Sequence, residues 1–138
     1  MYKCKHFHIT ELVPQSVYLD RGERAWELLD ERMLITADQL NDRFGAMIVN
    51  TWNYPNLIKK YGFRDQSGFR TETVGAKYSQ HFHGRALDAL FIEVTAAEVR
   101  KYVLSHASEF PYLAAIEDGV SWFHFDTRNC ERIKVFKP

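Results

Sequence analysis

The sequence is short of cysteine, contains no long hydrophobic run, and carries no excess of charge of either sign. Its two cysteines, Cys4 and Cys130, lie near opposite ends of the 138-residue chain. Two cysteines cannot form the disulfide framework of a small secreted domain, so we expect both to be free thiols. No stretch approaches the ~18 consecutive apolar residues of a membrane span, and we expect none.

The charge balance excludes a second group of functions. Lys plus Arg and Asp plus Glu number 18 each, so the formal net charge is zero. Proteins that bind nucleic acid or membrane surfaces through bulk charge carry a basic excess, which argues against both roles. The charged first six residues are not followed by an apolar run, so we expect no signal peptide. The length suits a single domain over 1–138 that buries roughly two-thirds of its unfolded surface.

Hydrophobic periodicity predicts an α+β fold with helices packed on an antiparallel sheet. Because the helical patterns mostly precede the clustered strands, an antiparallel sheet fits better than alternating βαβ units. Residues 14–16 are expected to form a loop, and 53–72 a long loop with one helical turn near 57–61. The predicted elements are two helices within 22–44, the second starting at Thr36, a helix over 95–109 with a capping box, and strands over 46–52, 85–94, 112–117, 120–127 and 133–136.

Two isolated groups of histidines have a plain explanation. Cys4, His6 and His8 alternate and would share one face of a strand. No fourth metal ligand lies within reach of them in the sequence, so an edge strand or tail is the better interpretation. His106 is expected to be a partly exposed helix histidine.

A third group has the pattern of a metal site. Six residues separate His81 from Asp88. Further on, His124 and Asp126 alternate with phenylalanines, so a half-buried strand would send the two polar side chains to one side. Two imidazoles and one carboxylate form a known zinc set that leaves one coordination position open. We therefore predict Zn²⁺ bound by His81, Asp88 and His124; the alternative is a hydrogen-bonded His–Asp pair.

These stretches resemble the motifs of the zinc D-Ala-D-Ala carboxypeptidase family. The motifs here are Ser79-x-His81-x-x-Gly84-x-Ala86-x-Asp88 and Trp122-x-His124-x-Asp126, with Ser67-Gly68-Phe69-Arg70 before them. The superfamily includes peptidoglycan peptidases, vancomycin-resistance dipeptidases and the hedgehog signalling domain, and the chain is most similar to short phage endolysins. The resemblance implies a hedgehog/DD-peptidase-like zinc-binding fold. It also implies hydrolysis of a D,D or L,D bond in the peptidoglycan stem peptide, by a carboxypeptidase or an endopeptidase.

The resemblance implies roles for individual residues as well. Zinc would lower the pKa of its bound water toward ~7 and polarise the scissile carbonyl. Arg70 matches the family's arginine, which would bind a substrate carboxylate or the developing oxyanion; a solvated loop arginine is the alternative. Further candidates for contact with the substrate are Arg64, Ser79, His83 and Trp122.

The general base is the point at which this chain departs from the family. Several branches have an acid three residues before the last histidine, where this sequence has Ser121. Glu117 and Asp118 come a little earlier, and a hairpin could return either carboxylate to the metal; we favour Glu117. Asp126 could be the base or could support a ligand from behind, and His83 is a weaker candidate.

The departure at Ser121 keeps a second function open, namely a zinc-containing binding module of the same fold without catalysis. A purely structural zinc is less favoured, because structural sites usually have four protein ligands. With no signal peptide expected, the resemblance implies a protein that stays in the cytoplasm until release, as phage lysins do, or one carried by a virion.

Overall fold

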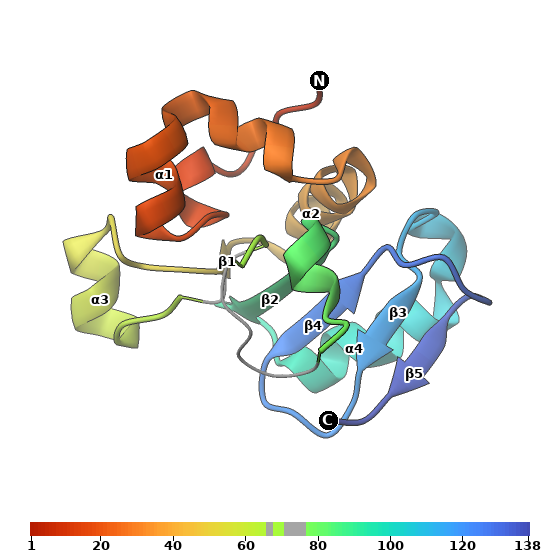
Figure 1. Cartoon of the computed structure of the whole chain (residues 1–138). Coiled ribbons are helices and arrows are strands. Elements are labelled where there is room, and N and C mark those ends of the chain that lie inside the picture. The colour runs from red at the N-terminus through yellow and green to blue at the C-terminus, as the bar shows by residue number, and fades with distance from the viewer. Residues whose placement is uncertain (66–67, 71–76) are drawn as a thin grey trace.

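The structure is a computed structural model that describes residues 1–65, 68–70 and 77–138. These residues form an α+β fold with four α-helices and a five-stranded sheet of order β1-β2-β4-β3-β5 (Figure 1). The helices are α1 (Gln15–Arg21), α2 (Glu31–Phe44), α3 (Pro55–Tyr61) and α4 (Ala96–Ser105). The strands are β1 (Met47–Ile48), β2 (Ala86–Phe91), β3 (Ala115–Glu117), β4 (Phe123–Asp126) and β5 (Lys134–Phe136). Short 3₁₀ helices are η1 (Ile9–Glu11), η2 (Gly22–Leu28), η3 (Gln80–His83) and η4 (Ala107–Glu109).

The sheet is mixed, which corrects the prediction of a purely antiparallel one. The pairs β1–β2, β2–β4 and β3–β4 are antiparallel, and the predicted hairpin of β3 and β4 is confirmed. The last strand, β5, instead runs parallel to β3. After β4 the chain passes β3 and returns on its far side, so β5 has the direction of β3 and forms an edge, as predicted.

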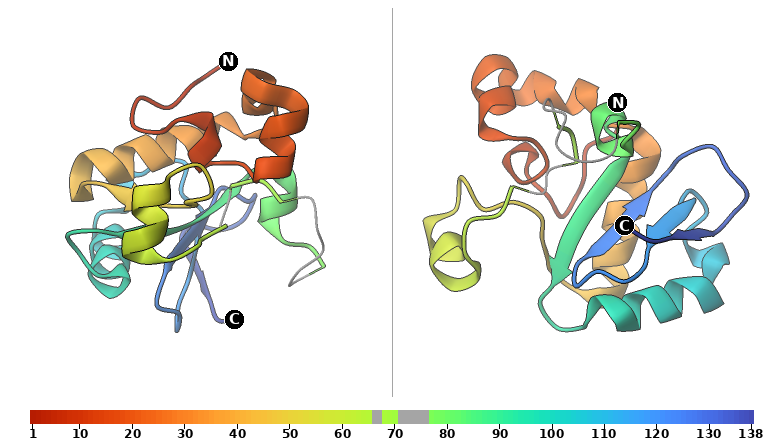
Figure 2. Two further views of the ribbon diagram at one scale, coloured as in Figure 1. Left: turned by 90° about the vertical axis from the view of Figure 1, so that its left-hand side faces the viewer. Right: turned by 60° about the horizontal axis from the view of Figure 1, so that its bottom comes forward.

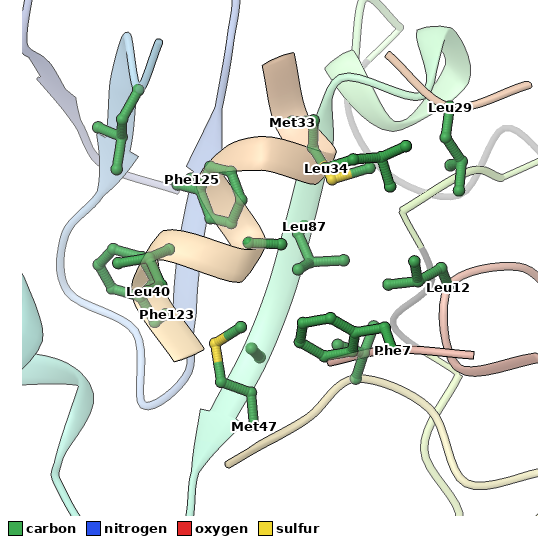
Figure 3. Packing of buried hydrophobic residues seen from close by; sticks show 14 of the residues in the cluster. Phe7, Leu12, Leu29, Met33, Leu34, Leu40, Met47, Leu87, Phe123 and Phe125 are labelled. Atoms are coloured by element: carbon green, nitrogen blue, oxygen red, sulfur yellow. The ribbon is translucent and has the colours of Figure 1, made fainter. Parts of the chain in front are cut away.

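The hydrophobic core joins α2 to one face of the sheet. Buried side chains on α2 recur at helical spacing and face β2 and β4 (Figure 3). They are Met33, Leu34, Ala37 and Leu40, packed with Leu87, Phe123 and Phe125. α1, η2 and α3 lie on one side of β2, and β3 to β5 on the other (Figure 2). A fully buried Leu or Phe contributes about 1.5–3 kcal/mol, so this packing fixes β2 and β4, the two strands that carry the site.

Helix starts in the first third differ from the prediction. The expected loop over 14–16 is wrong, because α1 begins directly after Pro14, whose φ of −61° is compatible with a helix start. The expected start at Thr36 is also wrong, because its hydroxyl donates to the Arg32 carbonyl inside α2. The cap is Asp30, which accepts from the Arg32 amide at 2.9 Å.

Several other elements begin or end at different residues from those expected. The Thr95–Glu98 capping box is confirmed, but α4 ends at Ser105 and a 3₁₀ turn follows. The run over 46–52 contributes only β1, and α3 occupies the first part of the long loop expected over 53–72. The parts of that loop at 66–67 and 71–72 lie outside the described residues.

The N-terminal segment is a tail that lies along α2. The amides of Lys5 and His6 donate to Asp38, and the His6 ring bonds Asp42 at 2.6 Å. The Cys4 thiol donates to a carbonyl of α2, and both cysteines are free, as predicted. Within the described ranges, every helix is too short or too polar to cross a bilayer.

Candidate metal centre

Three predicted ligands, His81, Asp88 and His124, meet on one side of the sheet. Asp88 on β2 and His124 on β4 are direct cross-strand partners, and His81 arrives from η3. Each offers a ligand atom, and these atoms all lie within 4.8 Å of one another. The three residues are only 3–7% exposed. The arrangement can therefore hold a metal ion, as the spacing of the two motifs predicted.

The turn around His81 explains how it reaches the strands. The Ser79 hydroxyl accepts the His81 amide and caps η3. Gly84 ends η3 with a φ of +63°, and a Cβ there would lie 2.0 Å from the Leu28 carbonyl oxygen. The Gly84 carbonyl also accepts the Asp30 amide at 2.9 Å. Because only glycine has both the conformation and the space, this position sets the approach of His81 to the sheet.

Asp88 is the centre of the charge network. Its Oδ1 lies 2.6 Å from Nδ1 of His124, and its Oδ2 lies 3.4 Å from Nε2 of His81. Arg70 donates from Nη2 to the same Oδ2 at 2.9 Å. Burial opposes the ionised form, but the hydrogen bonds of the two histidines outweigh it and hold the Asp88 pKa well below its usual range. The Asp88 side chain is therefore ionised and can bind a cation.

The two ring nitrogens of His124 have different partners. Nδ1 faces Asp88, while Nε2 lies 3.0 Å from Oδ2 of Asp126. Burial disfavours the charged ring, but its bonds to Asp126 and Asp88 raise the His124 pKa to about 9. Burial lowers the pKa of His81, which favours a neutral imidazole there. A cation among the three groups would replace the proton on Nδ1 of His124, because that nitrogen faces Asp88.

The donor set fits zinc. Two imidazoles and one carboxylate suit Zn²⁺, and three protein ligands leave a position for substrate or water. The far nitrogen of a metal-binding histidine usually bonds a carboxylate, which fixes the ring. Asp126 makes this contact with His124 and is 0% exposed. Of the two roles that the sequence left open for Asp126, the geometry fits support of His124.

A cavity of about 630 Å³ opens at the three ligands. Four further residues predicted for the site line it, namely Arg70, Ser79, Glu117 and Trp122. Four others are absent from its walls in the described part of the chain, namely Arg64, His83, Asp118 and Asp126. The preferred base, Glu117, therefore shares a cavity with the ligands.

The predicted residues outside the cavity walls have other surroundings. The carboxylate of Asp118 lies 3.6 Å from Nε of Arg100 on α4, and His83 is exposed. The Arg64 amide donates to the Thr51 hydroxyl at 2.9 Å. Burial lowers the pKa of the Arg64 guanidinium, and the charge of Asp88 opposes this shift.

Several cavity residues were not predicted. They are Lys77, Tyr78, Gln80, Arg128, Phe136, Lys137 and Pro138. Arg128 extends the alternation of His124 and Asp126 by two residues, so the period of the strand could have indicated it. Phe136 enters through the parallel pairing of β5 with β3, for which the sequence has no local signal.

These features define a class: an α+β protein with a buried cluster of two histidines and one aspartate at a cavity. No protein-family model, curated protein or solved structure matches the chain. A function for it therefore rests on the geometry of the site and on the resemblance of its motifs.

Proposed function

We propose that the chain is a zinc-dependent peptidase that hydrolyses peptide bonds of bacterial peptidoglycan, with a hedgehog/DD-peptidase-like fold. The observation that carries the proposal is the convergence of His81, Asp88 and His124 within 4.8 Å at a cavity that Glu117 also lines. The substrate class comes from the resemblance of the two motifs to the zinc D-Ala-D-Ala carboxypeptidase family.

Zinc would be held by His81, Asp88 and Nδ1 of His124. When bound, it would supply a Lewis acid for the scissile carbonyl and lower the pKa of water to near neutrality. Asp126 keeps the His124 ring in the orientation that points Nδ1 at Asp88. The buried surroundings strengthen these charge interactions, because the local dielectric is low.

Glu117 is the side chain we assign as general base. It is the last residue of β3, is half-buried, and lines the cavity. A carboxylate there can take a proton from the attacking water and return it to the leaving amine. Asp118 is the weaker candidate, because its carboxylate is directed to Arg100.

The cavity wall suits an anionic peptide. Its cations are Arg70, Lys77, Arg128 and Lys137. Arg70 already bonds Asp88 and Arg128 bonds Asp126, so Lys77 and Lys137 are the cations we assign to a peptide carboxylate. Arginine and lysine bind carboxylates through charge-assisted hydrogen bonds, and stem peptides carry carboxylates. Trp122 and Ser79 would contact the peptide beside them.

Digestion of defined muropeptides, with and without a chelator, tests this function. We expect cleavage that stops with the chelator, returns with Zn²⁺ and is lost in His124→Ala. Product masses separate release of D-alanine by a carboxypeptidase from cleavage by an endolysin-type endopeptidase. Full activity in His124→Ala would refute the proposal.

A binding module without catalysis is the second candidate. It is favoured by Ser121, an exposed serine where several branches of the family have an acid. A zinc-loaded protein that binds muropeptides and leaves all of them intact would support this candidate instead.

A further inference from the structure

Arg128 is bonded to the carboxylate that holds His124. Its Nε donates to Oδ1 of Asp126 at 2.7 Å, its Nη2 donates to Oδ2, and its amide donates to Oδ1 at 3.2 Å. Oδ2 of Asp126 is also the atom 3.0 Å from Nε2 of His124. A planar guanidinium that binds both oxygens fixes the plane of the carboxylate. The orientation of Asp126 behind the ring therefore depends on Arg128.

Arg128 also contacts a second neighbour of the same ring. Its guanidinium carbon lies 4.7 Å from the centroid of the Phe136 ring. Phe136 in turn meets His124 edge to face, with ring centroids 5.5 Å apart and planes at 83°. His124 is thus held from two directions, by Asp126 and by Phe136, and Arg128 touches both.

We propose that Arg128 is a positioning residue that orients His124 for metal binding, acting mainly through Asp126 and secondarily through Phe136. The inference rests on the zinc-binding part of the proposed function and not on the peptidase reaction. Its physical basis is that an imidazole binds a metal well only when its nitrogen is aimed at the ion. Loss of the partner that aims such a ligand typically costs 10–100-fold in metal affinity.

A merely structural Arg128 would behave differently. It would compensate the buried charge of Asp126 and so stabilise the fold, with no specific effect on the metal. Arg132 offers the matched control, because its guanidinium donates to the carbonyls of Leu113 and Phe110, both at 2.6 Å, and it is not a cavity residue. Loss of Arg132 should weaken the fold without turning His124.

The test measures zinc affinity by competition with a chromophoric chelator and the visible absorption of the Co²⁺-loaded protein. We expect Arg128→Met to lose roughly 5- to 10-fold in zinc affinity, at or below the low end of the cost of a direct partner because Arg128 acts through Asp126, and to change the Co²⁺ spectrum. Arg128→Lys keeps the charge but not the planar fork, so an intermediate loss is expected. Arg132→Met should lower the midpoint of urea unfolding and leave zinc affinity within twofold of wild type. Phe136→Leu should give a smaller loss, and it remains informative if Arg128→Met does not fold.

A double-mutant cycle shows whether Arg128 acts through Asp126. Since Asp126→Asn already weakens the hold on His124, adding Arg128→Met should cost less than the product of the two single losses. Losses that multiply in full would overturn the route through Asp126. Zinc affinity within twofold of wild type in folded Arg128→Met, or in Arg128→Lys and Phe136→Leu together, would overturn the positioning role. So would equal losses in the Arg128 and Arg132 variants.

The test of Arg128 and the test of the peptidase can fail independently of each other. A wild-type protein that binds Zn²⁺ but cleaves no muropeptide would refute the peptidase and leave the role of Arg128 to be judged by affinity alone. A wild-type protein that binds no Zn²⁺ would overturn both.

Discussion

His124 and Asp88 occupy directly opposite positions on β4 and β2, and Nδ1 of the histidine lies 2.6 Å from Oδ1 of the aspartate. Facing residues on antiparallel strands have Cβ atoms about 5 Å apart, close enough for two side chains to share an ion. A shift of one residue would turn one of them into the core. The register of β2 and β4 therefore assembles two of the three ligands, and η3 has only to deliver His81.

Removing one ligand should abolish tight zinc binding. For His81→Ala we expect a loss of affinity beyond the 10–100-fold that removal of a supporting partner costs, because a donor itself is gone. Zinc content after dialysis, measured by atomic emission, checks this. His106→Ala is the control, because this exposed histidine stacks on Tyr102 of α4, with ring centroids 3.9 Å apart. Equal zinc content in the two variants would show that the ion is held elsewhere.

Gly84→Ala should be among the most destabilising single changes near the site. Alanine would occupy a positive φ, which costs about 1–2 kcal/mol, and its Cβ would meet the Leu28 carbonyl oxygen at 2.0 Å. We expect the free energy of unfolding to fall by more than about 3 kcal/mol, with both costs added.

Gly62→Ala places alanine at a positive φ without a steric clash. Gly62 has a φ of +75° and a ψ of 174°, a backbone region that essentially only glycine adopts, but no atom lies within 4 Å of a Cβ placed there. The expected loss is therefore about 1–3 kcal/mol, from the backbone conformation without a clash. Urea unfolding of both variants measures the difference, and similar losses would mean that the turn at Gly84 can move away from Leu28.

The carboxylate of Asp30 should make stability depend on pH in the acid range. Its hydrogen bond with Arg32 and the neighbouring charge of Arg85 lower the Asp30 pKa against the opposing effect of burial. A free aspartate titrates near ~3.9, so the unfolded chain takes up this proton first as the pH falls. The stabilisation is complete above that value and is lost as the pH drops through the lower folded pKa.

Asp30→Asn tests this pH dependence. Asparagine is also a good helix cap, so the variant removes mainly the ion pairs with Arg32 and Arg85. We expect it to be less stable than wild type by about 1 kcal/mol at pH 7, with the difference shrinking below pH 4. Asp20→Asn, at an exposed position of α1, is the control. A difference that stays constant down to pH 2 would rule out the ionised carboxylate as its source.

The site was more predictable than the fold around it, for a physical reason. Alternation in a strand has a period of exactly two, so Phe123 and Phe125 had to face away from His124 and Asp126 once the strand was half-buried. The structure confirms this separation, with both phenylalanines in the core. Alternation alone does not say which of the two polar residues meets Asp88, because it assigns a face and not a neighbour; the choice of His124 as a ligand rested on ligand chemistry and on the resemblance of the motifs.

Helix starts and strand order depend on contacts that a local pattern does not contain. Thr36 resembled a cap because of the glutamine three residues later, yet Asp30 caps α2 and Thr36 is buried within it. The parallel pairing of β5 depends on packing beside β3, and this pairing brings Phe136 to the cavity. The role of Arg128 follows only when Asp126 is seen behind the His124 ring.

Glu117 and Asp118 are adjacent in sequence but differ in surroundings, so their amide variants can identify the base. Glu117→Gln keeps the shape of the side chain and removes its ability to take a proton. General base catalysis is worth about 10²–10⁴-fold, so we expect kcat on a muropeptide to fall by that factor while zinc content stays at the wild-type level. Asp118→Asn should have the smaller effect, because it loses an ion pair with Arg100 at 3.6 Å on the α4 side. The reverse order of the two effects would reassign the base to Asp118, and wild-type kcat in both would mean that another group moves the proton.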